Sequence, residues 1–337
     1  MGRRCVFLPL ALILTVSGLL FGQTNANDYP NPYRTVGAWG TLPAGRAWGP
    51  TSAVEIDMDG RSVWVAERCA AADCAMSSLA PILKFDANGS LVRSFGAGLF
   101  IVPHGIDVDR EGNIWVTDAS DGVSVVPGKG HQVFKFSADG RRLLTLGKAG
   151  VVGEGPDTFN RPSDVQVAPN GDIFVADGHG GNSNARIVKF SADGRFIKAW
   201  GKKGSGPGEF DTPHSLAMDS QGRLFVADLR NLRVQIFDQE GRYLTEWRQF
   251  GMPGGLYIDA ADTLYVADSL SVPDVNPGWT RGIRVASART GVVTAFIPDA
   301  TPLATPITAA EGVAADAMGN VYGAVVPARG VHLHVRN

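Results

Sequence analysis

Two of the six histidines in this chain occur in the same sequence context. His104 and His214 each follow a proline and open a short run with apolar residues at alternate positions, PHGIDV and PHSLAM. Aligned on this run, Glu311 opens the corresponding stretch EGVAAD near the C-terminus. Two imidazoles and a carboxylate, with a fourth position left open, are a ligand set typical of catalytic zinc. These residues therefore predict a metal site, provided that the fold brings them together.

The elements that must hold these residues are copies of one sequence repeat. Each copy starts with such an apolar run, passes through a turn such as DREG (109–112), and continues with a run of the type Gly-x-apolar-aromatic-Val-Ala-Asp. A third apolar run and an Asp-Gly or Glu-Gly hairpin turn follow, and a fourth run ends each clear copy. Four antiparallel strands in a repeat of roughly 40 or more residues are typical of one blade of a β-propeller.

Six copies can be aligned, so the sequence predicts an all-β, six-bladed β-propeller. The residues aligned with His104 and His214 are, in chain order, Ser52, His104, Ser163, His214, Gly254 and Glu311. The sixth copy stops after a third strand at residues 331–335, whereas residues 33–40 (YRTVGAWG) resemble the fourth strand of other copies. We therefore expect an N-terminal strand to complete the last blade, in one domain over residues 33–337. Closing the ring in this way covers two sheet edges.

The ring supplies the geometry that the chemistry needs. His104, His214 and Glu311 belong to the second, fourth and sixth copies, and alternate blades of a six-bladed ring lie ~120° apart. Their position begins the innermost strand, so we expect the three side chains to converge on the axis and bind one divalent metal. The alternative is that the histidines are ordinary polar residues of the channel. Another position of the repeat holds aspartate in four copies, and this recurrence predicts a structural role for these residues. They are Asp118, Asp177, Asp228 and Asp268.

Composition limits the possible partners and the compartment. Lys and Arg (31) nearly balance Asp and Glu (33), so no basic excess exists to neutralise phosphates, and nucleic acid is excluded as a partner. Residues 1–26 are predicted to be a signal peptide, because Arg3 and Arg4 precede an apolar stretch and Thr24 and Ala26 suit a cleavage site. Its removal leaves no membrane span and indicates a secreted or periplasmic protein, and a retained anchor is the alternative. No pattern predicts an oligomeric state.

Two cysteines remain after the signal peptide. Cys69 and Cys74 lie close in the sequence, and in an exported protein such a pair predicts a local disulfide. Two free thiols are the alternative. Without further ligands nearby, the pair is a poor zinc site.

The repeat resembles the NHL repeat over residues 33–335, as GNIWVTD (112–118) and RVQIF (233–237) illustrate. Within it, FIVPHGI (100–106) and FDTPHSL (210–216) resemble the peptidyl-α-hydroxyglycine α-amidating lyase, a family of secreted six-bladed propellers. That family cleaves a hydroxyglycine-extended peptide into a peptide amide and glyoxylate. The resemblance implies a zinc held by three histidines, a structural calcium in the channel, an essential arginine at the end of a strand in blade one, and a tyrosine that acts as base.

These roles transfer to the chain residue by residue. His104 and His214 match two of the zinc histidines, and the third falls on Glu311, which can bind zinc but weakens its Lewis acidity by lowering the charge of the site. Arg68, in VAERC, matches the arginine and would pair with a substrate carboxylate or an oxyanion. The tyrosine position falls on His179, which can act as a general base near neutral pH.

Calcium is the part of the implied site that fits least well. The family uses two backbone carbonyls, which match Val54 and Ile106 in this chain. Its acidic calcium ligand follows the third histidine, and that position is Gly312 here. The calcium set therefore lacks its carboxylate.

These observations favour a metal-dependent enzyme that resembles the amidating lyase. It would cleave the C–N bond of an N-acyl hemiaminal in a small peptide-like substrate and release glyoxylate, with zinc polarising the hydroxyl, His179 removing a proton and Arg68 holding the carboxylate. The alternative is a non-catalytic NHL propeller that binds a peptide, a glycan or a protein, which the changes at Glu311 and His179 favour. A calcium-dependent lactonase-type hydrolase is a third hypothesis, against which the histidine pair argues.

Overall fold

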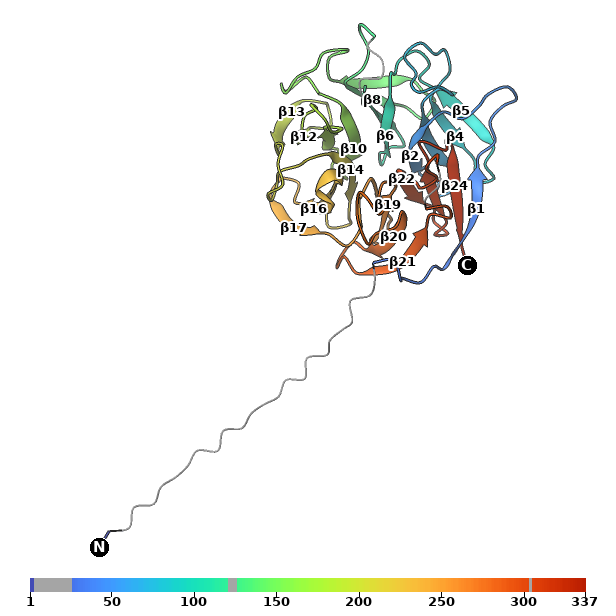
Figure 1. The fold of residues 1–337 in the computed structure, drawn as a ribbon. Helices are drawn as coiled ribbons and strands as arrows, with labels where there is room; N and C mark the ends of the chain where they lie inside the picture. Colours follow the sequence, from blue (N-terminus) through green and yellow to red (C-terminus); the bar gives the residue numbers. More distant parts are fainter. Residues whose placement is uncertain (3–25, 121–125, 303–304) are drawn as a thin grey trace.

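The computed structural model describes residues 1–2, 26–120, 126–302 and 305–337 (Figure 1). The signal peptide predicted for residues 1–26 lies, except for its ends, outside the described residues. No helix within the described ranges is long and apolar enough to cross a membrane. Their single helical segment is a 3-10 turn, Leu229–Asn231.

The described chain consists of six four-stranded antiparallel sheets, which confirms the predicted six-bladed propeller. The first three blades are β2 (Thr51–Ile56), β3 (Val63–Glu67), β4 (Ile82–Phe85) and β5 (Leu91–Phe95); β6 (Pro103–Val108), β7 (Ile114–Asp118), β8 (Gln132–Phe136) and β9 (Arg142–Leu146); and β10 (Pro162–Val167), β11 (Ile173–Asp177), β12 (Arg186–Phe190) and β13 (Phe196–Trp200). The last three are β14 (Pro213–Met218), β15 (Leu224–Asp228), β16 (Arg233–Phe237) and β17 (Tyr243–Trp247); β18 (Gly255–Ile258), β19 (Thr263–Asp268), β20 (Gly282–Ser287) and β21 (Val293–Pro298); and β22 (Gly312–Ala315), β23 (Val321–Ala324), β24 (Val331–Arg336) and β1 (Tyr33–Trp39).

The ring closes as expected. Strand β1 pairs antiparallel with β24, with Tyr33 opposite Arg336 and Trp39 opposite Val331, so the N-terminal strand is the outer strand of the last blade. In Figure 1 these two strands, blue and red, lie side by side. The first strands of neighbouring blades contact one another around the whole ring, from β2 to β6 and finally from β22 back to β2. These strands surround the axis, and β2, β6, β10, β14 and β22 are labelled near the centre of Figure 1.

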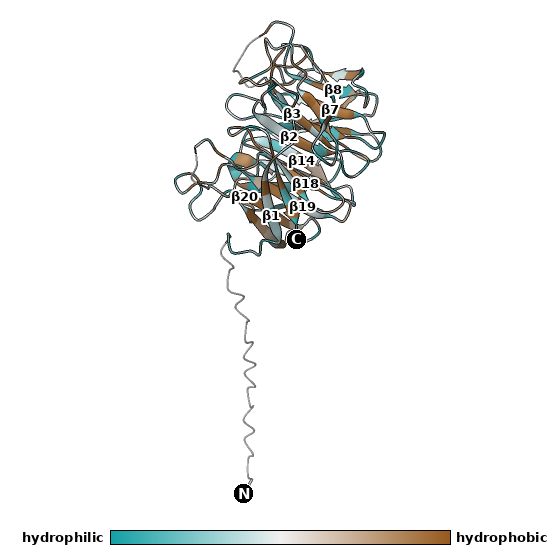
Figure 2. Ribbon diagram, turned by 90° about the vertical axis from the view of Figure 1, so that its right-hand side faces the viewer, coloured by the Kyte–Doolittle hydropathy of each residue, from teal (hydrophilic) through white to brown (hydrophobic). Residues whose placement is uncertain are grey.

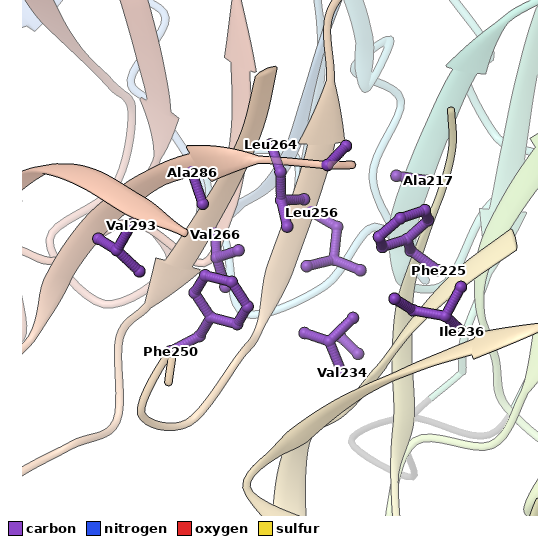
Figure 3. Close-up of a cluster of buried hydrophobic side chains, with 12 residues drawn as sticks. Ala217, Phe225, Val234, Ile236, Phe250, Leu256, Leu264, Val266, Ala286 and Val293 are labelled. Carbon is purple, nitrogen blue, oxygen red and sulfur yellow. The ribbon is translucent and has the colours of Figure 1, made fainter. Parts of the chain in front are cut away.

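Hydrophobic side chains fill the space between neighbouring blades. Figure 2 shows brown, hydrophobic stretches along the strands. Between the fourth and fifth blades, Phe225 and Val234 pack with Leu256 and Val266 in one buried cluster (Figure 3). Each strand contributes alternate residues to the two faces of its sheet, so every blade can bury apolar residues against both neighbours. This packing holds the six inner strands at fixed positions around the axis.

The recurring aspartates have the structural role that the sequence predicted. Each stands at the end of the second strand of its blade and accepts a hydrogen bond from a backbone N–H just before the first strand. The donors are Val102 N for Asp118 (2.7 Å), Asn160 N for Asp177 (2.8 Å), Asp211 N for Asp228 (2.9 Å) and Met252 N for Asp268 (3.1 Å). These bonds fix the entry to the inner strand, where the residues aligned with His104 lie. In blade one the predicted disulfide between Cys69 and Cys74 is present.

Candidate metal centre

An irregularity at the start of two inner strands sets the direction of two histidines. The pairing register of β6 with β7 shifts between Pro103 and Ile106, and that of β14 with β15 shifts between Pro213 and Ser215. His104 and His214 lie within these shifts, and such irregularities re-aim side chains. Both rings are buried, with 3% and 6% of the residue exposed.

Each ring is oriented by a main-chain carbonyl of the next blade. His104 Nδ1 lies 2.8 Å from the Ser163 carbonyl oxygen, and His214 Nδ1 lies 2.8 Å from that of Gly254. Because a carbonyl only accepts hydrogen bonds, Nδ1 carries the proton and donates in both rings. Nε2 is then the atom available to a ligand. Metal-binding histidines are typically oriented by a hydrogen bond of this kind.

Four potential ligands meet on the axis. Atoms of His104, His179, His214 and Glu311 that could bind a metal all lie within 4.8 Å of one another. Glu311 Oε1 is 3.2 Å from His104 Nε2 and 3.9 Å from His214 Nε2. The His179 ring centroid lies 4.5 Å from that of His104 and 5.1 Å from that of His214. The fold thus places the three predicted ligands beside the residue predicted as base.

The contact between His104 and Glu311 shows that the cluster suits a cation. With Nδ1 protonated, a neutral His104 turns the Nε2 lone pair toward a carboxylate oxygen, and two such acceptors repel one another. His104 Nε2 is buried, and its 3.2 Å contact with Glu311 Oε1 is an ion pair only when the ring carries a second proton. Either a second proton on the ring or a metal ion between the two atoms would remove this repulsion. Two ligands of tetrahedral zinc, with bonds of about 2.1 Å, lie about 3.4 Å apart, close to the observed 3.2 Å.

The charges in the cluster also suit a divalent metal. Burial, together with the neighbouring His104, lowers the pKa of His179 to well below its usual value and that of His214 to about 4. These two rings are therefore neutral at neutral pH, which is the state that binds metals. Burial alone would raise the pKa of Glu311, but His104, His214 and Arg68 lower it to about 2. The carboxylate is ionised, so the donor set of imidazoles and carboxylate fits zinc.

Two arginines direct positive charge at this cluster. Arg68 directly follows β3, is 8% exposed, and its charge lowers the pKa of His179, His214 and Glu311. Arg161 directly precedes β10 and also lowers the pKa of His179. Its backbone has a left-handed φ of 66°, uncommon for a residue with a side chain, and its N–H donates to His131 Nδ1.

The sequence analysis did not identify Arg161 as a site residue, although a signal existed. Arg161 stands directly before the proline of its repeat. The same position holds Val102, Thr212 and Met252 in three other copies, so Arg161 is the charged residue among these four.

The channel beneath the cluster is a cavity of about 680 Å³. His104, His214 and Glu311 line it, and so do Val54 and Ile106, the residues whose carbonyls the resemblance implies for calcium. Val54 lies on β2 and Ile106 on β6, two neighbouring inner strands. Calcium itself stays a prediction.

Three carboxyl groups that line the channel were not anticipated: Asp107 and Asp164, which are buried, and Glu55, which is half-buried. Burial raises the pKa of Glu55 well above its usual value, that of Asp107 to about 7 and that of Asp164 to about 6. Asp107 accepts a hydrogen bond from Val167 N, and Asp164 accepts one from Leu216 N, both at 2.8 Å and both across a blade boundary. Two of the three thus link neighbouring inner strands. The sequence offered one signal for these carboxyl groups, because each is an acidic residue within an otherwise largely apolar strand.

Comparison with known proteins finds the repeat and several similar sequences. A model described as "NHL repeat" matches residues 159–190 and 210–237. The chain is 39% identical to peptidyl-glycine alpha-amidating monooxygenase B of Xenopus laevis, over 60% of this chain and 24% of that protein. It is 41% identical to a probable peptidyl-alpha-hydroxyglycine alpha-amidating lyase of Caenorhabditis elegans, over 44% of this chain and 40% of that protein. The matched region thus spans less than half the length of either relative.

Among solved structures, a gluconolactonase of Xanthomonas campestris has a similar fold. The TM-score is 0.58 at 15% identity, and the match covers 89% of this chain and 97% of the other. At this identity the similarity concerns the fold alone.

Proposed function

We propose that this NHL-repeat propeller, which resembles the peptidyl-α-hydroxyglycine α-amidating lyase, is an exported metal-dependent lyase. Its substrate would be an N-acyl hemiaminal of the hydroxyglycine type at the end of a small peptide-like molecule. The observation that carries the proposal is the cluster of His104, His214 and Glu311 on the axis, with the charge of Arg68 directed at it. Zinc is the cofactor that this donor set suits best.

The three strand-borne residues would hold the metal. His104 and His214 present Nε2 atoms whose rings are fixed by carbonyls of the next blade, and Glu311 supplies an ionised oxygen. When bound, zinc would polarise the substrate hydroxyl as a Lewis acid. The carboxylate of Glu311 reduces the net positive charge of the site, so a moderate Lewis acid is expected.

His179 and Arg68 would act on the substrate itself. The neutral His179 imidazole can accept the hydroxyl proton, and Arg68 can pair with the substrate carboxylate. Loss of that proton turns the hydroxyl carbon into the aldehyde carbon of glyoxylate as its C–N bond breaks. The bonding electrons go to nitrogen, which takes up a proton to give the amide. A proton moved by His179 from oxygen to nitrogen balances the reaction.

The resemblance also suggests calcium, with the carbonyls of Val54 and Ile106 as two ligands in the channel. Gly312 supplies no carboxylate at the position of the third ligand. Calcium would stabilise the inner strands β2 and β6 rather than take part in the reaction.

Glyoxylate release from an α-hydroxyglycine peptide tests the proposal. Zinc-loaded protein should release glyoxylate, and His104→Ala should abolish release. His332→Ala is the matched control, because His332 is a half-buried histidine on β24 outside the cluster. Absence of release from the zinc-loaded wild type, or equal release from His104→Ala, would reject the proposal.

A second candidate is a non-catalytic NHL propeller that binds a peptide, a glycan or a protein. The observation that favours it is the fourth donor, His179, within reach of the other three. Four protein ligands are typical of structural zinc, whereas catalytic zinc keeps an open position. In this case the wild type would be loaded with zinc and would release no glyoxylate.

A further inference from the structure

We infer that His179 is a fourth metal ligand and an exchangeable one, which closes the site at rest and opens it by withdrawing. The inference concerns the metal site first. Its consequence for catalysis rests on the proposed function. It assigns to His179 a role beyond the base suggested by its position in the sequence.

His179 lies close enough to the other three potential ligands to bind the same ion. The His179 donor belongs to a group of four whose atoms are all within 4.8 Å of one another. Its ring centroid is as close to the His104 and His214 rings, at 4.5 and 5.1 Å, as those two rings are to each other, at 4.9 Å. A divalent ion held by the strand-borne residues would therefore also lie within reach of His179. Four donors of this kind complete a tetrahedral set.

The rings of His104 and His214 are oriented by hydrogen bonds, whereas the ring of His179 is not. His104 and His214 each donate Nδ1–H to a carbonyl at 2.8 Å, the type of support that fixes a metal-binding histidine. Among the described residues, no hydrogen bond reaches the His179 ring; Ser183 Oγ accepts only from its backbone N–H. The metal itself would thus be the main restraint on this ring. A ligand without such support is the one most readily released.

The element that carries His179 supports the same conclusion. His104 and His214 lie on inner strands, and Glu311 is tied to β23 by its N–H to the Ala324 carbonyl at 2.8 Å. His179 lies in the loop between β11 and β12, next to Gly178, Gly180 and Gly181. Gly180 and Gly181 have left-handed φ values of 76° and 60°, which glycine adopts without strain. Three ligands are therefore fixed by strands and one by a loop.

Release of His179 would connect the metal site to the reaction. Three remaining protein ligands with one open position are the arrangement of catalytic zinc. The released imidazole would stay beside the site, because its loop follows directly on strand β11. It can then take the substrate proton. His179 would thus occupy the fourth coordination position at rest and act as the base when substrate binds.

Cobalt spectroscopy and zinc affinity test this inference without use of the activity. Wild-type protein loaded with Co²⁺ should show the intense visible bands of a four-coordinate ion. His179→Ala should keep one ion per chain, show visible bands shifted in position and intensity because a water replaces an imidazole, and bind zinc on the order of 10–100-fold more weakly. X-ray absorption should count three imidazoles in the wild type and two in the variant. His179→Gln serves as a second variant and His332→Ala as the matched control, with circular dichroism to establish folding.

The outcomes separate this inference from the proposed function. If His179→Ala has the same cobalt spectrum and zinc affinity as the wild type, His179 is not a ligand and the inference fails, whatever the glyoxylate assay shows. If His179 is a ligand but the zinc-loaded wild type releases no glyoxylate, the closed site stands and the lyase proposal fails. If the wild type binds neither zinc nor cobalt, both fail.

Discussion

Removal of the metal should lower the thermal stability of this protein by a measurable amount. The four donors lie on, or directly next to, strands of the second, third, fourth and sixth blades. The unfolded chain cannot hold them together because they are far apart in the sequence. A metal that binds only the folded state stabilises it by RT ln(1 + [L]/Kd), which is about 2.7 kcal/mol when free metal is 100 times Kd.

The size of the temperature shift follows from the size of the protein. A change of 1 kcal/mol moves Tm by roughly 2–4 °C in a domain of 150–250 residues. This propeller is somewhat larger, so about 2.7 kcal/mol should correspond to about 5 °C. Because the affinity enters as a logarithm, each further tenfold excess of zinc should add about 1.4 kcal/mol.

Thermal unfolding followed by circular dichroism measures this shift, first in chelator and then across a zinc series. His104→Ala should remove the dependence on zinc, and His332→Ala should retain it. If the contact between His104 and Glu311 is only an ion pair and the cluster binds no metal, zinc should leave Tm unchanged. A wild-type Tm that is the same in chelator and in excess zinc would therefore refute the reasoning.

Three further predictions concern single side chains. Arg68→Ala should lower kcat/KM for a hydroxyglycine peptide by about 30-fold or more, the effect of about 2 kcal/mol from a lost charge pair, and Arg68→Lys should lose less. Asp228→Ala should reduce the free energy of unfolding in urea by about 1–3 kcal/mol, because it removes one of the two carboxylates that pair with the buried Arg233 and the acceptor of Asn231 and Gln235. Asp118→Asn should be less stable than the wild type, and the deficit should be about 1 kcal/mol larger at pH 5 than at pH 7.5.

The sign of the Asp118 prediction follows from its pKa. Burial raises the pKa of Asp118 from 3.8 to about 6, so the folded state binds the proton more tightly than the unfolded state. The wild type therefore gains stability as the pH falls from 7.5 to 5, whereas the asparagine variant, which does not titrate, gains none from this position.

Each of these three predictions has a result that contradicts it. A constant or reversed difference between the stabilities of wild type and Asp118→Asn would contradict the prediction for Asp118. Equal urea midpoints for wild type and Asp228→Ala would contradict the role of that aspartate. Unchanged kcat/KM in Arg68→Ala would show that the guanidinium does not contact the substrate.

The architecture of this protein could be predicted from the sequence because a propeller repeats one local pattern. Each blade is built from neighbouring strands joined by hairpins, so the glycine and aspartate turns specify pairing within a blade. The missing fourth strand of the last copy and the matching residues 33–40 then determined how the ring closes. The same regularity placed His104, His214 and Glu311 in alternate blades, where the structure brings them within reach of one ion.

The loops did not follow from the repeat. His179 was recognised as a site residue, but only the tertiary structure shows that its ring lies as near to His104 and His214 as they do to each other. Its loop carries no periodic pattern, and its path depends on contacts with residues of other elements, such as the bond of Asn184 Nδ2 to the Gly153 carbonyl. Arg161 was missed although it occupies a position of the repeat, directly before the proline that begins β10.

The sequence by itself determined the fold, the closure of the ring and the three strand-borne donors, because inward-facing positions of a strand repeat with a fixed period. The tertiary structure decided how many donors the axis offers. A loop side chain reaches the axis through the packing of several blades, which no local pattern encodes. The difference between three potential metal ligands and four is therefore a property of the folded ring.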